Sequence, residues 1–137
     1  MLKHVNVIAL EKKFVQLQAE LIILRARFYR EASASLNEAT TEFESCRCED
    51  GGLTEHATWM LGIARALEDT LNTKGVREFM DTFNELAYDE WVQFNHEWWS
   101  LGLAIESVEG QIKETKKALM SARQNCQMEQ AFKDAGF

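Results

Sequence analysis

Proline is absent from this chain of 137 residues, whereas average protein composition would supply roughly seven prolines at that length. A proline inside a helix removes a hydrogen bond and clashes with the preceding turn, so this kind of interruption is excluded throughout. Seven glycines are the only strong helix breakers that remain. The composition therefore predicts an all-α fold.

Cysteine is also scarce, and the three cysteines, Cys46, Cys48 and Cys126, cannot all pair with one another. Small secreted proteins that depend on disulfides contain more cysteines, and contain them in pairs. Residues 1–6 lack the long apolar core of a secretory signal peptide. We therefore expect a reducing, cytoplasmic location.

Long apolar runs and an excess of positive charge are both missing. The longest apolar run covers residues 21–24, far short of the ~20 residues that cross a bilayer. Lys and Arg number 15 against 22 Asp and Glu, which gives a formal charge of −7. Because nucleic-acid binding depends on basic side chains, we expect no direct nucleic-acid partner and no membrane partner. A content of 46% hydrophobic and 27% charged residues fits a single helical domain over residues 1–137.

Apolar residues recur at alternating steps of three and four over residues 3–46, as in a helix packed lengthwise against another helix. After Phe28 two successive steps of four shift the stripe by one position, which locally relaxes supercoiling. The helix should end by residues 49–52, because adjacent glycines favour a turn. The stripe consists of Val7, Leu10, Phe14, Leu17, Leu21, Leu24, Phe28, Ala32, Leu36, Ala39, Phe43 and Cys46.

The segment 54–73 carries the same apolar spacing and has signals at both ends. Thr54 is a suitable N-cap, and Lys74 followed by Gly75 is a typical way to end a helix. The stripe of this segment consists of Leu53, Ala57, Met60, Ala64, Leu67 and Leu71.

The segment 76–132 keeps its register through Gly102 and Gly110, so we expect one long helix. A break between Ser100 and Gly110, which would give four helices instead of three, is the main alternative. The stripe consists of Val76, Met80, Phe83, Ala87, Trp91, Phe94, Trp98, Leu101, Ile105, Val108, Ile112, Thr115, Leu119, Ala122 and Cys126.

The three predicted helices differ in length, at about 65, 30 and 80 Å for a rise of ~1.5 Å per residue. In an up-down-up bundle the short middle helix leaves apolar residues of both long helices uncovered. Burying a leucine-sized side chain contributes ~1.5–3 kcal/mol, so we expect these residues to be covered. Either the third segment folds back into a four-helix bundle or a second chain covers them, and we favour a homodimer.

Charge is unevenly distributed along the chain: residues 78–112 contain eight acids and no Lys or Arg, while residues 3–30 contain six bases and two acids. One explanation is internal pairing, in which these stretches lie side by side in a parallel alignment. The other is an acidic surface that binds a basic protein partner. A smaller basic face late in the chain is interpreted as solvated, and it consists of Lys113, Lys116, Lys117 and Arg123.

Acidic and aromatic residues of the third segment are the candidates for partner binding. Glu78, Asp81, Glu85 and Asp89 are spaced three and four apart and therefore share one helix face. Tyr and Trp are frequent in binding hot spots, although Trp91, Phe94 and Trp98 are expected in the core. The predicted partner-binding residues are Glu78, Asp81, Glu85, Tyr88, Asp89, Glu90, Glu97 and Trp99.

No catalytic, metal-binding or cofactor-binding signature is present. The residues three positions before His4, His56 and His96 are not acidic, so the Glu-x-x-His pairs of di-iron bundles are absent. Cys46 and Cys48 supply at most half of a zinc site, which needs four ligands. Neither a Gly-x-Ser-x-Gly turn nor a phosphate-binding glycine loop occurs.

These observations predict a non-enzymatic, all-helical interaction protein that self-associates along its long helices and binds a basic protein partner through acidic and aromatic residues. The alternative is a small acidic inhibitor, of the kind that phages and mobile elements encode, which blocks the basic nucleic-acid-binding groove of its target. An enzyme with a site inside the bundle is a third alternative.

Overall fold

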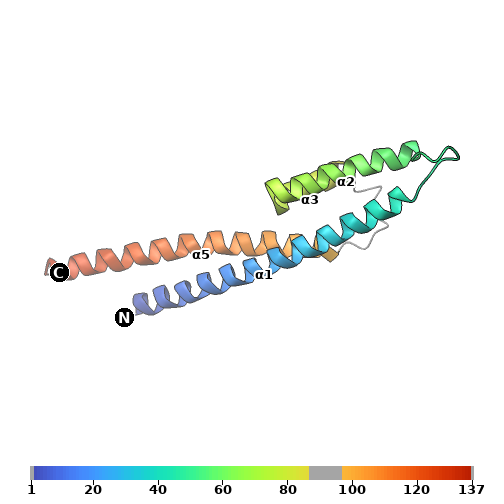
Figure 1. Ribbon diagram of the computed structural model, residues 1–137. Helices are drawn as coiled ribbons and strands as arrows, with labels where there is room; N and C mark the ends of the chain where they lie inside the picture. The colour runs from blue at the N-terminus through green and yellow to red at the C-terminus, as the bar shows by residue number, and fades with distance from the viewer. Residues whose placement is uncertain (1, 87–96, 137) are drawn as a thin grey trace. The chain divides into compact units, whose positions relative to one another are not determined.

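The described part of the chain folds almost entirely into α-helices. In this computed structural model the backbone is described for residues 2–86 and 97–136, with side chains from residue 6 onward. The helices are α1 (Leu2–Glu44), α2 (Glu55–Lys74), α3 (Val76–Leu86) and α5 (Glu97–Asp134) (Figure 1). No strand occurs within these ranges, and the helices pack against one another, which confirms the predicted all-α helical bundle.

The chain divides into two compact units, and α1 and α5 contribute to both. The first unit comprises Met1–Ile23 and Ile105–Phe137, so its described helices are the beginning of α1 and most of α5. The second unit comprises Leu24–Ala104 and contains the rest of α1, all of α2 and α3, and the first residues of α5. The single domain expected over residues 1–137 stays a prediction.

An aromatic cluster forms the core of the second unit. The ring of Phe28 on α1 lies edge to face with Phe79 of α3 and with Trp98 of α5, at centroid distances of 5.8 Å in both cases. Such pairs contribute ~0.5–1.5 kcal/mol beyond the area they bury, so the cluster holds three helices together. The α1 stripe is buried through its predicted shift in register, at Phe28, Ala32, Leu36, Ala39 and Phe43.

The ends of α2 confirm the predicted signals. The hydroxyl of Thr54 accepts a hydrogen bond from the amide of Ala57 at 3.1 Å, as an N-cap does. Gly75 has a φ of 92°, a left-handed conformation that glycine adopts without strain. The amide of Cys48 donates to the carbonyl of Gly52 at 2.6 Å, which closes the turn predicted at residues 49–52.

The single helix predicted over residues 76–132 is wrong. Phe83 of α3 and Trp98 of α5 have ring centroids 4.7 Å apart, whereas a continuous helix would separate these positions by about 22 Å at ~1.5 Å per residue. The chain therefore folds back between Leu86 and Glu97, as in the four-helix alternative. The reversal lets the apolar sides of α3 and α5 bury one another, which a straight helix could not do.

The break does not lie between residues 100 and 110, where the alternative placed it. α5 runs without interruption from Glu97 to Asp134 and includes both Gly102 and Gly110. Gly102 is buried, and a methyl group at its position would lie 2.8 Å from Cε of Met80 and 3.1 Å from Cε2 of Phe28. This glycine therefore permits close packing of helices and does not end one.

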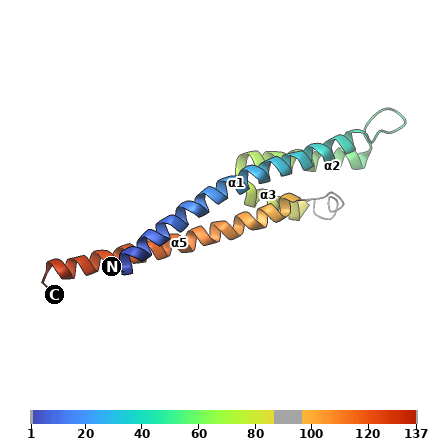
Figure 2. The same cartoon turned by 90° about the horizontal axis from the view of Figure 1, so that it is seen from below.

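In the first unit α1 and α5 lie side by side in opposite directions, with the start of α1 and the end of α5 together (Figure 1, Figure 2). Nη2 of Arg123 donates to Oε1 of Glu11 at 3.1 Å across the pair. The parallel alignment expected between the first and third segments is therefore wrong here, because the third segment has already turned back before α5 begins.

The heptad stripes face each other in the first unit, but two helices cover them only in part. Ile105, Val108 and Leu119 of α5 are buried. On α1 only Leu17 reaches full burial, and the other stripe residues of this unit (Val7, Leu10, Phe14 and Leu21) stay half-buried. The predicted seam is thus present and incompletely covered within the described residues.

Candidate interaction surfaces

Three of the predicted acidic residues form an exposed stripe on α3. The side chains that α3 buries against the core are Val76, Phe79, Met80 and Phe83. Glu78, Asp81 and Glu85 project from the opposite side of the helix and are exposed. Within the described ranges, none of these three carboxylates forms an ion pair with a Lys or Arg. Glu78, Asp81 and Glu85 are called the acidic stripe below.

Two more predicted residues lie at the start of α5. Glu97 is exposed in the first turn, where the helix dipole favours a carboxylate. Trp99 is half-buried, with its ring centroid 6.1 Å from Phe83 and 5.7 Å from Trp98. Trp98 lies in the core and Trp99 is partly exposed, as the heptad register predicted.

The remaining predicted partner-binding residues, Tyr88, Asp89 and Glu90, lie outside the described residues. The core positions predicted at Ala87, Trp91 and Phe94 lie outside them as well. The described part of the predicted site therefore consists of the acidic stripe, Glu97 and Trp99.

The three cysteines are free, and Cys46 is exposed rather than buried as its place in the heptad stripe predicted. The reason is that α1 ends at Glu44, so the thiol of Cys46 lies beyond the helix and donates to the carbonyl of Glu42 at 3.6 Å. Among the residues that the structure describes, no group of three or more His, Cys, Asp or Glu side chains could hold a metal ion.

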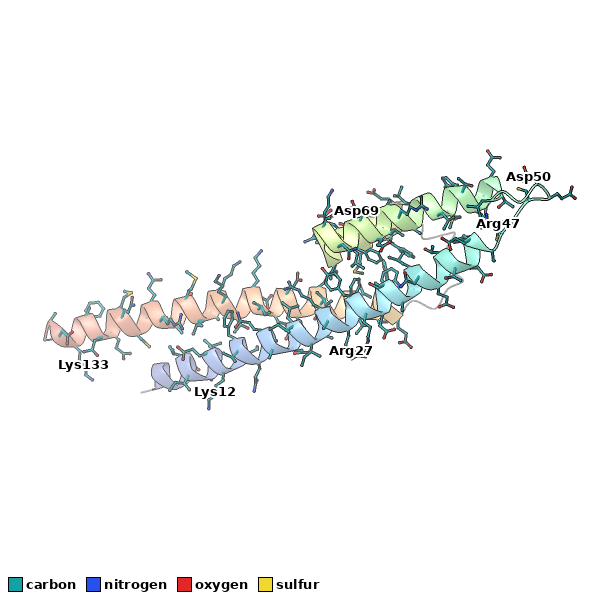
Figure 3. All side chains as sticks on the ribbon, in the orientation of Figure 1. Lys12, Arg27, Arg47, Asp50, Asp69 and Lys133 are labelled. Carbon is teal, nitrogen blue, oxygen red and sulfur yellow. The ribbon has the colours of Figure 1, made fainter. Side chains whose placement is uncertain are left out.

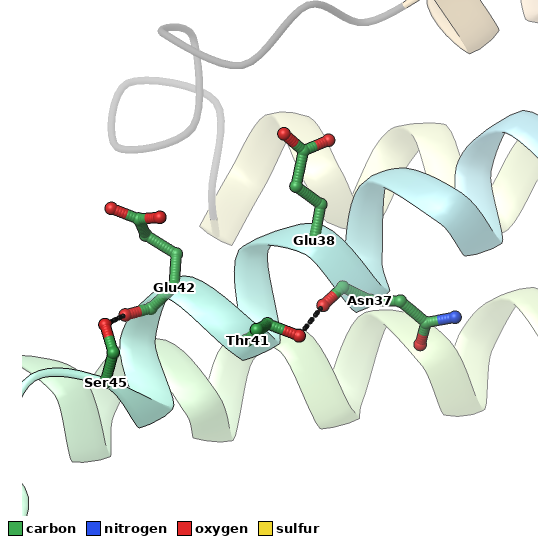
Figure 4. A pocket seen from close by; sticks show the side chains of 5 residues that line it. All are labelled: Asn37, Glu38, Thr41, Glu42 and Ser45. Atoms are coloured by element: carbon green, nitrogen blue, oxygen red, sulfur yellow. Dashed lines mark hydrogen bonds between the residues drawn. The ribbon is translucent and has the colours of Figure 1, made fainter.

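A hollow beside the last turns of α1 is lined by polar side chains, but these side chains do not point toward one another (Figure 4). The hydroxyl of Thr41 donates to the carbonyl of Asn37 at 2.9 Å, and the hydroxyl of Ser45 donates to the carbonyl of Glu42 at 2.6 Å. Both hydroxyls thus bind main-chain carbonyls of α1, and the carboxylates of Glu38 and Glu42 point away from them. We assign no ligand to this hollow.

The first unit exposes an apolar stripe that the sequence analysis missed. Ile8, Val15 and Ile22 of α1 are 52%, 62% and 69% exposed. Their spacing of seven places them on one helix face, beside the seam that contacts α5. Ile8, Val15 and Ile22 are called the apolar stripe below. The available signal was that α1 is apolar on more than one side, which is unusual for a helix facing solvent.

Val15 also lines a groove between α1 and α5 within the first unit. The other apolar walls are Phe14, Leu119 and Met120, and the groove encloses about 520 Å³. The polar side chains around it are Glu11, Lys116 and Arg123. Figure 3 shows the side chains of both helices of this unit, with Lys12 labelled on α1 and Lys133 labelled near the end of α5. The groove therefore combines apolar walls with a mainly basic rim.

Comparisons with protein-family models, with curated proteins and with solved structures find no match to this chain. In the described parts of the chain, no helix combines the length and the apolar character needed to cross a bilayer.

Proposed function

We propose that this chain is a non-enzymatic interaction protein that binds a basic protein partner through the acidic stripe of α3. The proposal is supported by one observation above all: Glu78, Asp81 and Glu85 are exposed on one helix face without an ion pair to a described Lys or Arg. Like charges at this spacing repel by about 0.2–0.5 kcal/mol per pair. A basic partner would offset this repulsion.

Trp99 and Glu97 belong to the same unit as the acidic stripe but lie on α5. Trp99 packs against Phe83, on the side of α3 opposite the stripe, and is half-buried. An arginine placed over an exposed Trp ring gains ~0.5–1 kcal/mol. Because the stripe lies on the other side of α3, an arginine-rich partner would have to contact both sides of that helix to use the carboxylates and the ring together.

Self-association and a reducing location belong to the same proposal. Ile8, Val15 and Ile22 recur on one exposed face of α1, and exposed apolar patches often mark protein–protein contacts, which supports self-association. Three free cysteines favour a reducing, cytoplasmic compartment.

A second candidate function is inhibition of a nucleic-acid-binding protein. The absence of Lys and Arg from residues 78–112 favours this function, since a uniformly negative surface resembles the charge of a phosphate backbone. An inhibitor of this kind competes with DNA or RNA for its target, whereas a scaffold does not. Displacement of the captured partner by duplex DNA would therefore separate the two functions.

The test of partner binding compares two charge-reversal variants. Asp81→Lys with Glu85→Lys reverses most of the acidic stripe. Glu68→Lys with Asp69→Lys reverses the same number of exposed acids on α2. Wild type and both variants are immobilised on a resin and incubated with lysate of the native host. The bound proteins are quantified by mass spectrometry at low and high salt.

We expect the α3 variant to lose a basic partner that wild type and the α2 variant retain. Binding should also weaken as salt rises, since charge complementarity is screened. Equal capture by both variants, with helicity unchanged by circular dichroism, would overturn the proposal.

A further inference from the structure

The turn between α1 and α2 is held in one shape by main-chain hydrogen bonds. Residues 46–48 pair with residues 52–54 through an antiparallel bridge, and main-chain amides donate across this pair at 2.6 and 3.3 Å. Gly51, with a φ of 85°, lets the chain reverse between the two stretches. Figure 3 labels Arg47 and Asp50 in this turn. Residues 46–48 are therefore a short extended strand in a closed hairpin.

Cys46 and Cys48 share one face of this strand. Successive side chains of an extended strand lie on opposite faces, so residues two apart lie on the same face and Arg47 lies on the other. Both thiols are free and exposed. The residue paired across from Cys48 is Gly52, which has no side chain to cover the thiols. The hairpin therefore presents two thiols together to solvent.

The spacing of the two cysteines fits an ion between their sulfurs better than a bond between them. At ~3.3 Å per residue, Cα atoms two residues apart in a strand are separated by about 6.6 Å. Disulfides most often join residues whose Cα atoms are ~5.5–6 Å apart, with sulfurs ~2.05 Å apart. Two sulfurs on opposite sides of one ion, each at a metal–thiolate bond length of ~2.3 Å, are about 4.6 Å apart. The strand therefore favours metal binding over a disulfide.

The number and softness of the two ligands indicate which ion fits. Two thiolates are half of the ligand set that a structural zinc site needs. They are a complete set for Cu(I), which is a soft ion that cysteine ligands select and which two thiolates bind in a linear arrangement. The pair therefore matches Cu(I) without a contribution from any other element of the fold.

We propose that the strand of residues 46–48 binds Cu(I) through the thiolates of Cys46 and Cys48. Two Cu–S bonds form and the two thiol protons pass to solvent, so the site changes from neutral to a charge of −1 without oxidation or reduction. The thiol of Cys46 donates to the carbonyl of Glu42 at 3.6 Å in the free protein, and this weak bond is given up on binding. The inference does not rest on the function proposed above.

An anaerobic titration of the full chain with Cu(I), in competition with a chromogenic Cu(I) chelator, tests the site. Wild type is expected to bind one ion per chain. Cys126→Ser is the matched control, since it removes the remaining cysteine, which lies half-buried on α5, and it should bind as wild type does. Cys46→Ser and Cys48→Ser should each weaken binding by more than the ~10–100-fold that loss of an outer-shell partner costs, because each removes a direct ligand.

A further variant tests the geometry of the pair and not the number of thiols. Arg47→Cys combined with Cys48→Ser keeps two cysteines in the turn but places them on adjacent residues, which lie on opposite faces of a strand. We expect this variant to bind Cu(I) as weakly as Cys48→Ser does. Circular dichroism confirms that each variant keeps the helicity of wild type. Binding as tight as that of wild type would overturn the assignment of the site to one face of the strand.

X-ray absorption at the copper edge of the loaded protein should show two sulfur neighbours in wild type and in Cys126→Ser. Three other results would overturn the inference. Unchanged affinity in Cys46→Ser or Cys48→Ser would show that the pair is not the site. One ion for every two chains would assign the ion to thiols of two copies. A reduced chain that takes no Cu(I) from the chelator, yet forms a disulfide between Cys46 and Cys48 in a glutathione buffer, would assign the pair to redox chemistry.

Discussion

Phe83 and Trp98 pack edge to face, with ring centroids 4.7 Å apart and an interplanar angle of 87°. This contact joins α3 to α5, and the same indole ring contacts Phe28 of α1. Three helices of the second unit therefore meet on one buried side chain, and its removal should affect the whole unit.

Trp98→Ala is expected to lower the free energy of unfolding by ~3–5 kcal/mol, because it empties a site lined by aromatic rings. Trp59→Ala is the matched control, since Trp59 is 53% exposed on α2 and its loss should cost less than about 1 kcal/mol. Urea denaturation followed by circular dichroism measures both. Equal losses in the two variants would contradict the core position of Trp98.

Gly102→Ala and Gly110→Ala should change stability in opposite directions. Both glycines lie inside α5, where alanine is favoured by ~1 kcal/mol. A methyl group at Gly110 meets nothing within 4 Å, whereas at Gly102 it crowds Met80 and Phe28. Overpacking a core costs ~1–3 kcal/mol, so the melting temperature should rise for Gly110→Ala and fall for Gly102→Ala. A rise for both would mean that Met80 adjusts without cost.

Thr54→Ala should destabilise the protein by ~1 kcal/mol, because it removes the side-chain oxygen that caps α2. Thr54→Ser keeps that oxygen and should retain most of the stability. Thermal unfolding compares the two variants with wild type. If serine were as damaging as alanine, the hydrogen bond to Ala57 would not be the cause.

Ile105→Ala should cost ~2–5 kcal/mol, since Ile105 is 1% exposed. Leu21→Ala should cost less, because Leu21 is half-buried and part of its side chain already contacts water. Urea denaturation at low protein concentration measures the difference. An equal loss in both variants would show that Leu21 is fully buried in solution.

The sequence predicted which residues are buried better than it predicted the course of the chain. Every residue of the predicted α1 stripe from Val7 to Phe43 is buried or half-buried. Burial follows the local spacing of apolar residues, and that spacing is visible in the sequence. The ends of α2 were predictable for a similar reason, since Thr54 and Gly75 act on the helix beside them.

The reversal between α3 and α5 had no local signal. Residues 87–96 contain neither glycine nor proline, and an apolar stripe keeps the same spacing whether the next stretch continues a helix or folds back on it. The contact of Phe83 with Trp98 decides between these courses, and it is a tertiary contact.

The candidate site was predictable only as a pattern of positions. Glu78, Asp81 and Glu85 share a face because α3 is helical there. The apolar stripe escaped notice because Ile8, Val15 and Ile22 each directly follow a seam residue, so the seam alone accounted for that part of the sequence. Which molecule binds the acidic stripe or the apolar stripe depends on the surface of that molecule, which this sequence does not contain.

The helix α1 runs unbroken from Leu2 to Glu44, although its two halves belong to units with different numbers of described helices. Amide hydrogens exchange with solvent through local opening, which is easier where fewer contacts hold a helix. Deuterium should therefore enter residues 6–23 sooner than residues 24–44 of the same helix. If a second copy closes over the first stretch, this contrast should fade as the protein is concentrated.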